Sequence, residues 1–276
     1  MSTYNKLLQT AREILKQQKI ADADVDAWYL LAHVFNMKRT DLLLHGEEPA
    51  SEEGSNRYIE FVRQRAGHIP LQHITGSQEF MGLEFDVTED VLIPRQDTEV
   101  LVEEVLKICS DKKVLDMCTG SGCIIISLSK LAKLQKATGV DLSVKALMIA
   151  KKNANKHMVE IEFLQSDLFD LVEESYDVIV SNPPYIPTGE IESLMPEVKL
   201  HEPLTALDGS ADGLLFYRKI TSASRIHLNK GGFLFFEIGH NQGEEVKQIL
   251  QEEGFTEVTI KKDLSKRDRV VFAKRS

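Results

Sequence analysis

The sequence predicts an α/β protein in which a small helical domain precedes a mostly parallel sheet with helices on both faces. From about residue 112 onward, strand-like and helix-like runs alternate, which is the pattern of a parallel sheet connected by crossover helices. Before residue 76, apolar residues recur only at helical spacing. The 276 residues suffice for about two domains, and contents of 42% hydrophobic and 28% charged residues are typical of globular proteins.

Residues 1–75 are predicted to form the helical domain. Apolar residues at helical spacing predict one helix near residues 4–17 and a second over 22–36. A third is expected over 51–67, where Ser51 is a suitable N-cap and Gly67 a suitable stop. We expect these helices to pack as a small bundle.

Residues 76–95 are predicted to form a linker, in which the spacing of apolar residues changes. Apolar and polar residues alternate through "QEFMGLEFDVTEDVLIP" around a central glycine, which predicts a β-hairpin. A helix with acidic residues in its first turns is expected from Pro94 onward.

Residues 96–276 are predicted to form the second domain. Seven strands are expected, at 112–117, 136–142, 161–167, 176–182, 232–239, 255–260 and 269–274. Helices are expected between them, at 122–134, 143–157, 212–228 and 242–254. Ligands of such sheets bind at the carboxyl ends of the strands, so these ends are where a site is sought.

Composition excludes several classes of protein. A net charge of −10 argues against a protein that holds nucleic acid mainly through its phosphates. No apolar run approaches the roughly 20 residues of a membrane helix, and no signal-peptide core follows the first charges. The three cysteines form no CxxC pair and have no histidine cluster beside them, so we expect no metal site and a cytoplasmic location.

A glycine-rich turn, "LDMCTGSGC" (115–123), follows the first strand of the predicted sheet. Such a turn alone is a weak sign of a nucleotide-like ligand. Acidic residues end three successive strands, namely Asp116, Asp141 and Asp167, and each alone is also a suitable helix N-cap. Together they suit a ligand with positive charge and hydroxyl groups, and S-adenosylmethionine has a sulfonium, an amino group and a ribose. The turn therefore favours methyl transfer.

A second loop, "SNPPYIP" (181–187), follows the strand "YDVIV". Two prolines fix two φ angles and remove two N–H donors, so the loop is rigid and rich in acceptors. The Asn182 side-chain oxygen and the carbonyl groups near Pro183 and Pro184 can accept both hydrogens of a planar –NH2 group. Tyr185 can cover the flat face of that group. A stiff structural turn is the alternative interpretation.

Several further segments resemble the PrmC/HemK family. The linker "PLQHITGSQEFMGLEFDVTEDVLIPRQDTEVLVE" is similar to the linker of that family, and "YDVIVSNPPYIP", "HEPLTALDGSADGLLFYRKI" and "FEIGHNQ" match it in order. The resemblance covers nearly the whole chain. It implies a Rossmann-like, seven-stranded class I methyltransferase domain. It also implies that S-adenosylmethionine is used to methylate the amide nitrogen of the glutamine in the GGQ motif of class 1 peptide chain release factors, which modulates translation termination.

The resemblance also implies roles for individual residues. The glutamine amide would be held by Asn182, Pro183, Pro184 and Tyr185. The cofactor would be held by Arg95, Cys118, Thr119, Gly120, Ser121, Gly122, Asp141, Leu142, Asp167, Leu168 and Asn182. Thr98, Glu202 and Pro203 would line or support the same cleft. Residues 1–75 would recognise the release factor, with no membrane and no direct nucleic acid involved.

Two positions depart from the family pattern. Cys118 stands where the family usually has glycine, and "PRQDTE" stands where it has "PRPETE". If residue 118 has a positive φ, its side chain is strained, and we expect it to be a small buried apolar residue.

Three other functions stay open at this point. A related enzyme methylates a glutamine of a ribosomal protein with the same loop. A DNA or RNA amino-methyltransferase is a second alternative, which the acidic composition and the small helical domain oppose. The third is a binding protein without catalysis, which the intact "NPPY" opposes.

Overall fold

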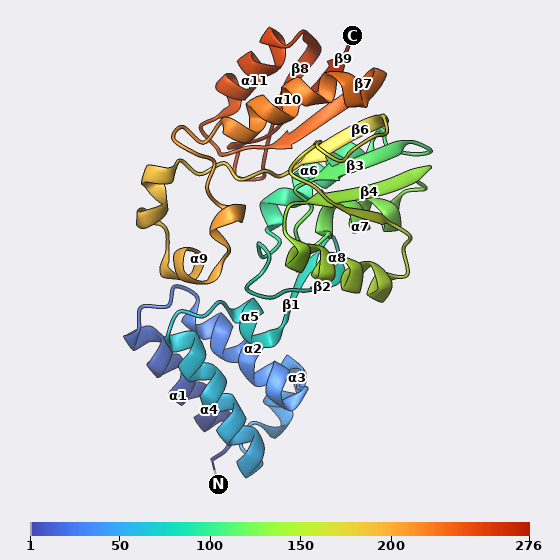
Figure 1. Cartoon of the computed structure of the whole chain (residues 1–276). Coiled ribbons are helices and arrows are strands. Elements are labelled where there is room, and N and C mark those ends of the chain that lie inside the picture. Colours follow the sequence, from blue (N-terminus) through green and yellow to red (C-terminus); the bar gives the residue numbers. More distant parts are fainter. Residues whose placement is uncertain (1) are drawn as a thin grey trace. The chain divides into compact units, whose positions relative to one another are not determined.

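The computed structural model of the chain describes residues 2–276 and divides them into two compact units (Figure 1). One unit comprises residues 2–76 together with Met195–His201, and the other comprises Ser77–Leu194 and Glu202–Ser276. The sequence assigns 195–201 to the second domain, whereas the structure groups this segment with the N-terminal helices. Within residues 2–276, no helix has the length and apolar character needed to cross a membrane.

The first unit is entirely helical apart from its connections. Its helices are α1 (Tyr4–Gln17), α2 (Ala23–Phe35), α3 (Arg39–His45), α4 (Glu52–Ala66), α5 (Leu71–Thr75) and α9 (Pro196–His201). The predicted N-cap of α4 is confirmed, because the Ser51 hydroxyl accepts a hydrogen bond from the Gly54 amide. The apolar faces of α1, α2 and α4 form one core, which includes Leu15, Leu31 and Val62. The short helices α3, α5 and α9 were not predicted.

A buried arginine explains why the segment of α9 belongs to the helical unit. Arg65 of α4 donates from Nε to Asp26 of α2 at 2.7 Å and from Nη1 to Glu197 of α9 at 3.0 Å. The Arg65 and Asp26 side chains are each only 9% exposed. A buried guanidinium needs such partners, so its two carboxylates fix the three helices to one another.

A buried hydrogen bond between α4 and α2 leads to a first prediction. The Tyr58 hydroxyl donates to the Ala27 carbonyl oxygen at 2.9 Å, and Tyr58 is fully buried. Replacing Tyr58 by phenylalanine is expected to lower the free energy of unfolding by about 1 kcal/mol, since the ring packing stays and one hydrogen bond is lost. Urea unfolding followed by the fluorescence of Trp28, the chain's single tryptophan, measures this loss within the same unit.

Tyr29 offers the matched control, because its side chain is largely exposed in the same helix as Ala27. Tyr29→Phe is expected to change the free energy of unfolding by less than about 0.5 kcal/mol. Equal losses in the two variants would contradict the role given to the Tyr58 hydroxyl.

The second unit begins with a β-hairpin made of β1 (Ser77–Phe80) and β2 (Leu83–Asp86), which pair antiparallel. The two turn residues, Met81 and Gly82, have φ angles of 52° and 71°. Positive φ at both positions is the conformation of the tight two-residue turns that match strand twist. The Met81 amide donates to Glu99 at 2.7 Å and so ties the turn to the next helix.

The sheet of the second unit has seven strands in the order β5-β4-β3-β6-β7-β9-β8. The strands are β3 (Lys113–Met117), β4 (Lys136–Asp141), β5 (Glu162–Gln165), β6 (Tyr176–Ser181), β7 (Leu228–Glu237), β8 (Phe255–Lys262) and β9 (Asp268–Arg275). The first five in this order are parallel, and β9 is antiparallel to both of its neighbours. The predicted mostly parallel, seven-stranded sheet is confirmed.

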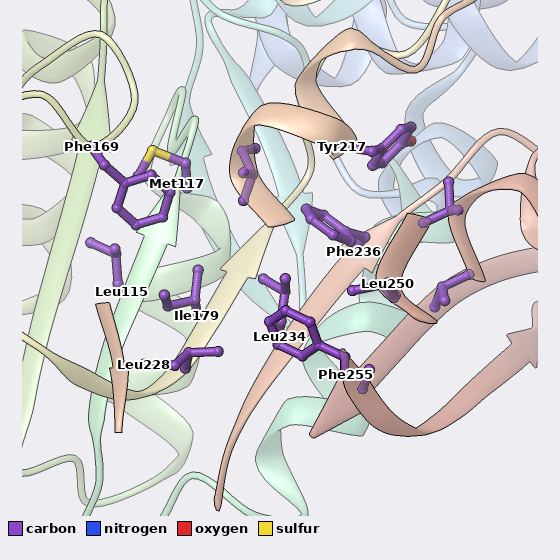
Figure 2. Close-up of a cluster of buried hydrophobic side chains, with 14 of the residues drawn as sticks. Leu115, Met117, Phe169, Ile179, Tyr217, Leu228, Leu234, Phe236, Leu250 and Phe255 are labelled. Carbon is purple, nitrogen blue, oxygen red and sulfur yellow. The ribbon is translucent and has the colours of Figure 1, made fainter. Parts of the chain in front are cut away.

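Helices cover both faces of this sheet (Figure 1). They are α6 (Glu99–Leu106), α7 (Cys123–Leu131), α8 (Val144–His157), α10 (Leu215–His227) and α11 (Gly243–Glu252), with short 3₁₀ turns η1 (Gln96–Thr98), η2 (Thr188–Ser193) and η3 (Leu204–Ala206). Because side chains alternate along a strand, neighbouring residues enter different cores. Leu115, Ile179 and Leu234 enter the core with α10 and α11 (Figure 2), and Val114, Val178 and Phe235 enter the core with α6 and α7.

The direction of the strand order reverses between β3 and β6. The chain proceeds from β3 to β4 and β5 on one side and then continues with β6 and β7 on the other. Met117, the last residue of β3, pairs with Ser181, the last residue of β6. The loops that follow these two strands therefore start side by side at the switch point, where open α/β sheets bind their ligands.

Candidate active site

A cavity of about 560 Å³ lies at the carboxyl ends of the parallel strands, within the second unit. This volume is in the range of small-molecule sites. Its walls come from the loops after β3, β4, β5 and β6, from the segment before α6, and from residues 203–208.

The structure brings most of the predicted site residues to this cavity. Those that line it are Arg95, Cys118, Thr119, Gly120, Ser121, Asp141, Leu142, Asp167, Leu168, Asn182 and Pro184, joined by Thr98 and Pro203. The lining does not include Gly122, Pro183 or Tyr185. The roles of all these residues stay predictions.

The two glycines of the loop after β3 serve different purposes. Gly120 has a φ of +55°, and a Cβ added there would meet no atom within 4 Å, so its backbone is open to the cavity. Gly122 has a φ of +80°, and a Cβ there would lie 2.8 Å from Cδ1 of Ile126. Gly120 thus allows close approach of a ligand, whereas Gly122 allows the loop to pack on α7.

Cys118 has the positive φ that its position suggested, at 63°. A non-glycine residue in this conformation carries a strain of about 1 kcal/mol. Its side chain packs against the core of α10 and α11, and burial raises the pKa of the thiol. A thiol with a raised pKa is a poor nucleophile. Cys118 is only partly buried and lines the cavity, so the expectation of a fully buried residue is not met.

The three strand-end acids have separate environments. Asp116 is fully buried below the cavity, where it accepts a hydrogen bond from the Thr119 hydroxyl at 2.6 Å, and burial raises its pKa to about 7. Asp141 lines the cavity and accepts hydrogen bonds at 2.8 Å from the backbone amides of Gly120 and Ser143. Asp167 is exposed. Asp116 therefore shapes the loop, and Asp141 and Asp167 are the acids that can face a ligand.

The loop after β6 presents Asn182 to the cavity. Asn182 donates from Nδ2 to the Thr98 hydroxyl oxygen at 3.4 Å, and its side-chain oxygen is then left as an acceptor. The preceding Ser181 donates to the Met117 carbonyl oxygen at 2.6 Å, which ties the end of β6 to β3. Pro183 and Pro184 are buried, as a rigid loop requires.

Sequence comparisons place both parts of the chain in known families. Residues 6–76 match the PrmC N-terminal domain, and residues 95–198 match the methyltransferase small domain. A release factor glutamine methyltransferase of Geobacter sulfurreducens is 40% identical over 98% of this chain and 95% of its own. One of Clostridium acetobutylicum is 40% identical over 96% of each chain. The chain belongs to the release factor glutamine methyltransferase family. The family resemblance seen in the sequence is confirmed, and the protein is a methyltransferase.

A solved structure agrees at the level of the fold. The 16S rRNA N2 G1207 methyltransferase of T. thermophilus, in complex with AdoMet and guanosine, aligns with 72% of this chain and 50% of its own. The TM-score is 0.53 and the sequence identity is 18%. The Rossmann-like methyltransferase fold is thereby confirmed.

Tyr185 of this family member lies behind the cavity wall. Its carbonyl oxygen accepts a hydrogen bond from Nε2 of Gln242 at 3.0 Å, and its ring packs against the core of α10 and α11. A Cβ on Gly209 would lie 2.8 Å from the Tyr185 Cα, so the chain passes closely there. Stacking of the Tyr185 ring on a substrate amide stays a prediction.

Arg95, which was expected to contact the cofactor, has a protein partner. Its Nη2 donates to Glu202 Oε1 at 2.5 Å, and the Glu202 side chain is almost completely buried. The acidic residues that line the cavity are Asp90, Asp141, Asp167 and Asp208. Because its only basic lining residue among those described is already paired, the cavity favours a positively charged ligand.

Sequence reasoning missed two buried polar residues next to the site. Glu237, at the end of β7, is 2% exposed, and Gln242 is 7% exposed. Gln242 supports the loop after β6 through its contact with Tyr185. The signal for Glu237 was an acid directly after the apolar run "FLFF", in the strand next to "YDVIV". Within residues 2–276, no group of three or more histidine, cysteine or acidic residues is arranged to hold a metal ion.

Proposed function

We propose that this methyltransferase transfers a methyl group from S-adenosylmethionine to the side-chain amide nitrogen of the glutamine in the GGQ motif of class 1 peptide chain release factors, and so modulates translation termination. The observation that supports this most is the Asn182 amide, whose NH2 group is bonded to Thr98. The free oxygen of Asn182 suits one hydrogen of a planar amide. The names of the relatives, release factor glutamine methyltransferases, point to the same substrate.

The residues that line the cavity suit S-adenosylmethionine. Asp141, whose two oxygens already accept backbone hydrogen bonds, has lone pairs left for ribose hydroxyls. Gly120 leaves space for the ligand beside the backbone, and Asp167 supplies negative charge nearby. Leu142 and Leu168 offer apolar surface. When bound, the cofactor supplies a methyl group made electrophilic by the positive sulfur.

The loop residues orient the acceptor. An amide nitrogen is a poor nucleophile because its lone pair is delocalised into the carbonyl group. Hydrogen bonds from its two N–H groups to the Asn182 oxygen and to a backbone carbonyl of the same loop hold it in place, and the lone pair then points toward the methyl carbon. The nitrogen–carbon bond forms as the carbon–sulfur bond breaks, and the nitrogen then releases one proton. No strong base is needed before the attack, because the methylated nitrogen is acidic.

Recognition of the release factor is assigned to the N-terminal helices as part of this proposal. The match of residues 6–76 to a domain named for this family supports that assignment. A cytoplasmic location is also proposed, since release factors act on ribosomes there and the sparse cysteines suit a reducing compartment.

The test is to incubate the purified protein and labelled S-adenosylmethionine with a class 1 release factor and, in separate reactions, with total tRNA, DNA and ribosomal protein. We expect mass spectrometry to locate the methyl group on the GGQ glutamine and to find none when that glutamine is replaced by alanine. Label only in ribosomal protein or nucleic acid would refute the substrate and leave the amide chemistry in place.

A further inference from the structure

Gln242 is a buried side chain at the point where β7 leads into α11. Its backbone is fixed, because its amide donates to the Gly239 carbonyl oxygen and its carbonyl oxygen accepts from the Val246 amide. Its side chain joins three segments. Oε1 accepts from the Gly239 amide at 2.9 Å, and Nε2 donates to the carbonyl oxygens of Tyr185 at 3.0 Å and Gly213 at 3.4 Å. The end of β7, the loop after β6 and the turn before α10 therefore meet at one amide.

The orientation of the Gln242 amide follows from its partners. A backbone N–H group can only donate and a carbonyl oxygen can only accept, so Oε1 faces Gly239 and Nε2 faces Tyr185. An amide turned over would bring an oxygen against two carbonyl oxygens and an NH2 group against a backbone N–H. Because Gln242 is only 7% exposed, water cannot readily replace the lost hydrogen bonds. The two hydrogens of Nε2 therefore hold the Tyr185 carbonyl beside the turn before α10.

The turn before α10 has a glycine where Tyr185 passes it. Gly213 has a φ of +73°, and a Cβ added there would overlap the Tyr185 carbonyl oxygen and lie 2.7 Å from Nε2 of Gln242. Both the positive φ and the missing side chain are properties of glycine. Gly213 therefore allows the Tyr185 carbonyl oxygen and the Gln242 amide to meet.

A rigid stretch of chain connects this contact to the cavity. Only Pro183 and Pro184 separate Tyr185 from Asn182, and each proline has a fixed φ angle. A displacement of the Tyr185 carbonyl is therefore passed on to Asn182, which lines the cavity.

We propose that Gln242 is a positioning residue for methyl transfer, which holds the Tyr185 carbonyl and thereby fixes the place of Asn182 at the cavity wall. Gln242 itself does not line the cavity and acts through the loop after β6. This inference rests on the proposed function in one respect, namely that this loop receives the acceptor amide.

Replacement of Gln242 by methionine tests the proposal. Methionine has a similar length but no amide, so kcat is expected to fall by at least about 10-fold and the Kd for S-adenosylmethionine to change by less than about 3-fold. Asp177→Ala is the matched control, because Asp177 accepts hydrogen bonds from Lys113 at 2.9 Å and from Asn229 at 2.8 Å near the opposite end of β6. Its kcat is expected to stay within about 2-fold of the wild type. Equal losses of kcat in the two variants would overturn the proposal.

A methyl group on the turn before α10 tests the same contact from its other side. Gly213→Ala forces the Tyr185 carbonyl away from Gln242 and is expected to lower kcat by at least about 10-fold. Gly254→Ala is the matched control for backbone strain, because exposed Gly254 has a φ of +82° and a Cβ there would meet no atom of the described residues within 4 Å. Its kcat is expected to change by less than about 2-fold. The same kcat in both alanine variants would contradict the proposal.

A double-mutant cycle separates positioning of Asn182 from a general structural role. If Gln242 acts through Asn182, Gln242→Met is expected to lower kcat by less than about 2-fold in an Asn182→Ala background. Gly213→Ala is expected to behave in the same way in that background. Losses that multiply across the cycle would overturn the proposal.

Hydrogen exchange gives a readout that does not depend on the acceptor. The Ile186 and Thr188 amides donate to the carbonyl oxygens of Leu207 and Ser210, each at 3.0 Å, so their exchange reports on the loop after β6. Mass spectrometry is expected to show exchange at least about 10-fold faster in Gln242→Met than in the wild type. Equal exchange would overturn the inference even if the wild type methylates a release factor. Conversely, a wild type that leaves the release factor unmethylated, together with faster exchange in Gln242→Met, would refute the substrate and retain the inference.

Discussion

Replacement of Asn182 by alanine is expected to lower kcat by about 10²- to 10³-fold, the loss that follows removal of one oriented polar group from a transition state. In the proposed function the Asn182 oxygen fixes the acceptor amide, and its NH2 group is bonded to Thr98, so alanine removes the only side-chain acceptor that the loop after β6 offers among the residues lining the cavity. In the same proposal the cofactor is held by Asp141 and the loop after β3. Its Kd is therefore expected to change by less than about 3-fold.

Single-turnover rates at saturating S-adenosylmethionine, together with calorimetric titration of the cofactor, measure the two effects separately. Asn229→Ala is the matched control, since Asn229 is exposed at the start of β7 and its amide bonds only to Asp177 among the described residues. That variant is expected to retain the wild-type kcat. A large loss of cofactor binding with a normal rate at saturation would contradict the role assigned to Asn182.

The parts of the site that sequence predicts well are those whose place follows from the strand order. Asp141 is the last residue of β4 and Asn182 directly follows β6, and the carboxyl ends of parallel strands meet at one edge of the sheet. Once the strands and helices are assigned correctly, the sequence therefore predicts that both residues lie at one cavity. The long helices and all seven strands of the sheet were also predictable, because the apolar residues of each segment follow a pattern typical of its structure.

The parts that sequence does not predict depend on contacts between distant segments. Thr98 comes from a 3₁₀ turn far from β6 in sequence, and no local pattern says that its hydroxyl meets the Asn182 amide. The segment of α9 is short and has no clear apolar face, so its place with the N-terminal helices depends on the pairing of Glu197 with Arg65. Tyr185 packs against the core, and Gln242, also distant in sequence, bonds to its carbonyl oxygen.

Replacement of Asp141 by alanine is expected to weaken S-adenosylmethionine binding by about 100-fold or more. Hydrogen bonds to a charged group contribute about 1.5 to 3 kcal/mol each, and two ribose hydroxyls can donate to this carboxylate. Alanine also removes the acceptor of the Gly120 and Ser143 amides, which the carboxylate binds at 2.8 Å. The loop after β3 then loses the contact that holds it in the shape of the cavity wall.

Calorimetric titration with S-adenosylmethionine measures this loss without reference to any acceptor. Asp141→Asn is expected to bind with intermediate affinity, because its amide keeps one acceptor oxygen but sets an NH2 group against a backbone N–H. Asp170→Ala removes an exposed carboxylate from the neighbouring loop after β5 and is expected to leave the Kd within about 2-fold, since an exposed charge is screened by solvent. Equal losses in Asp141→Ala and Asp170→Ala would mean that overall negative charge attracts the cofactor. A loss confined to the Asp141 variants would mean that hydrogen bonds at the end of β4 hold it.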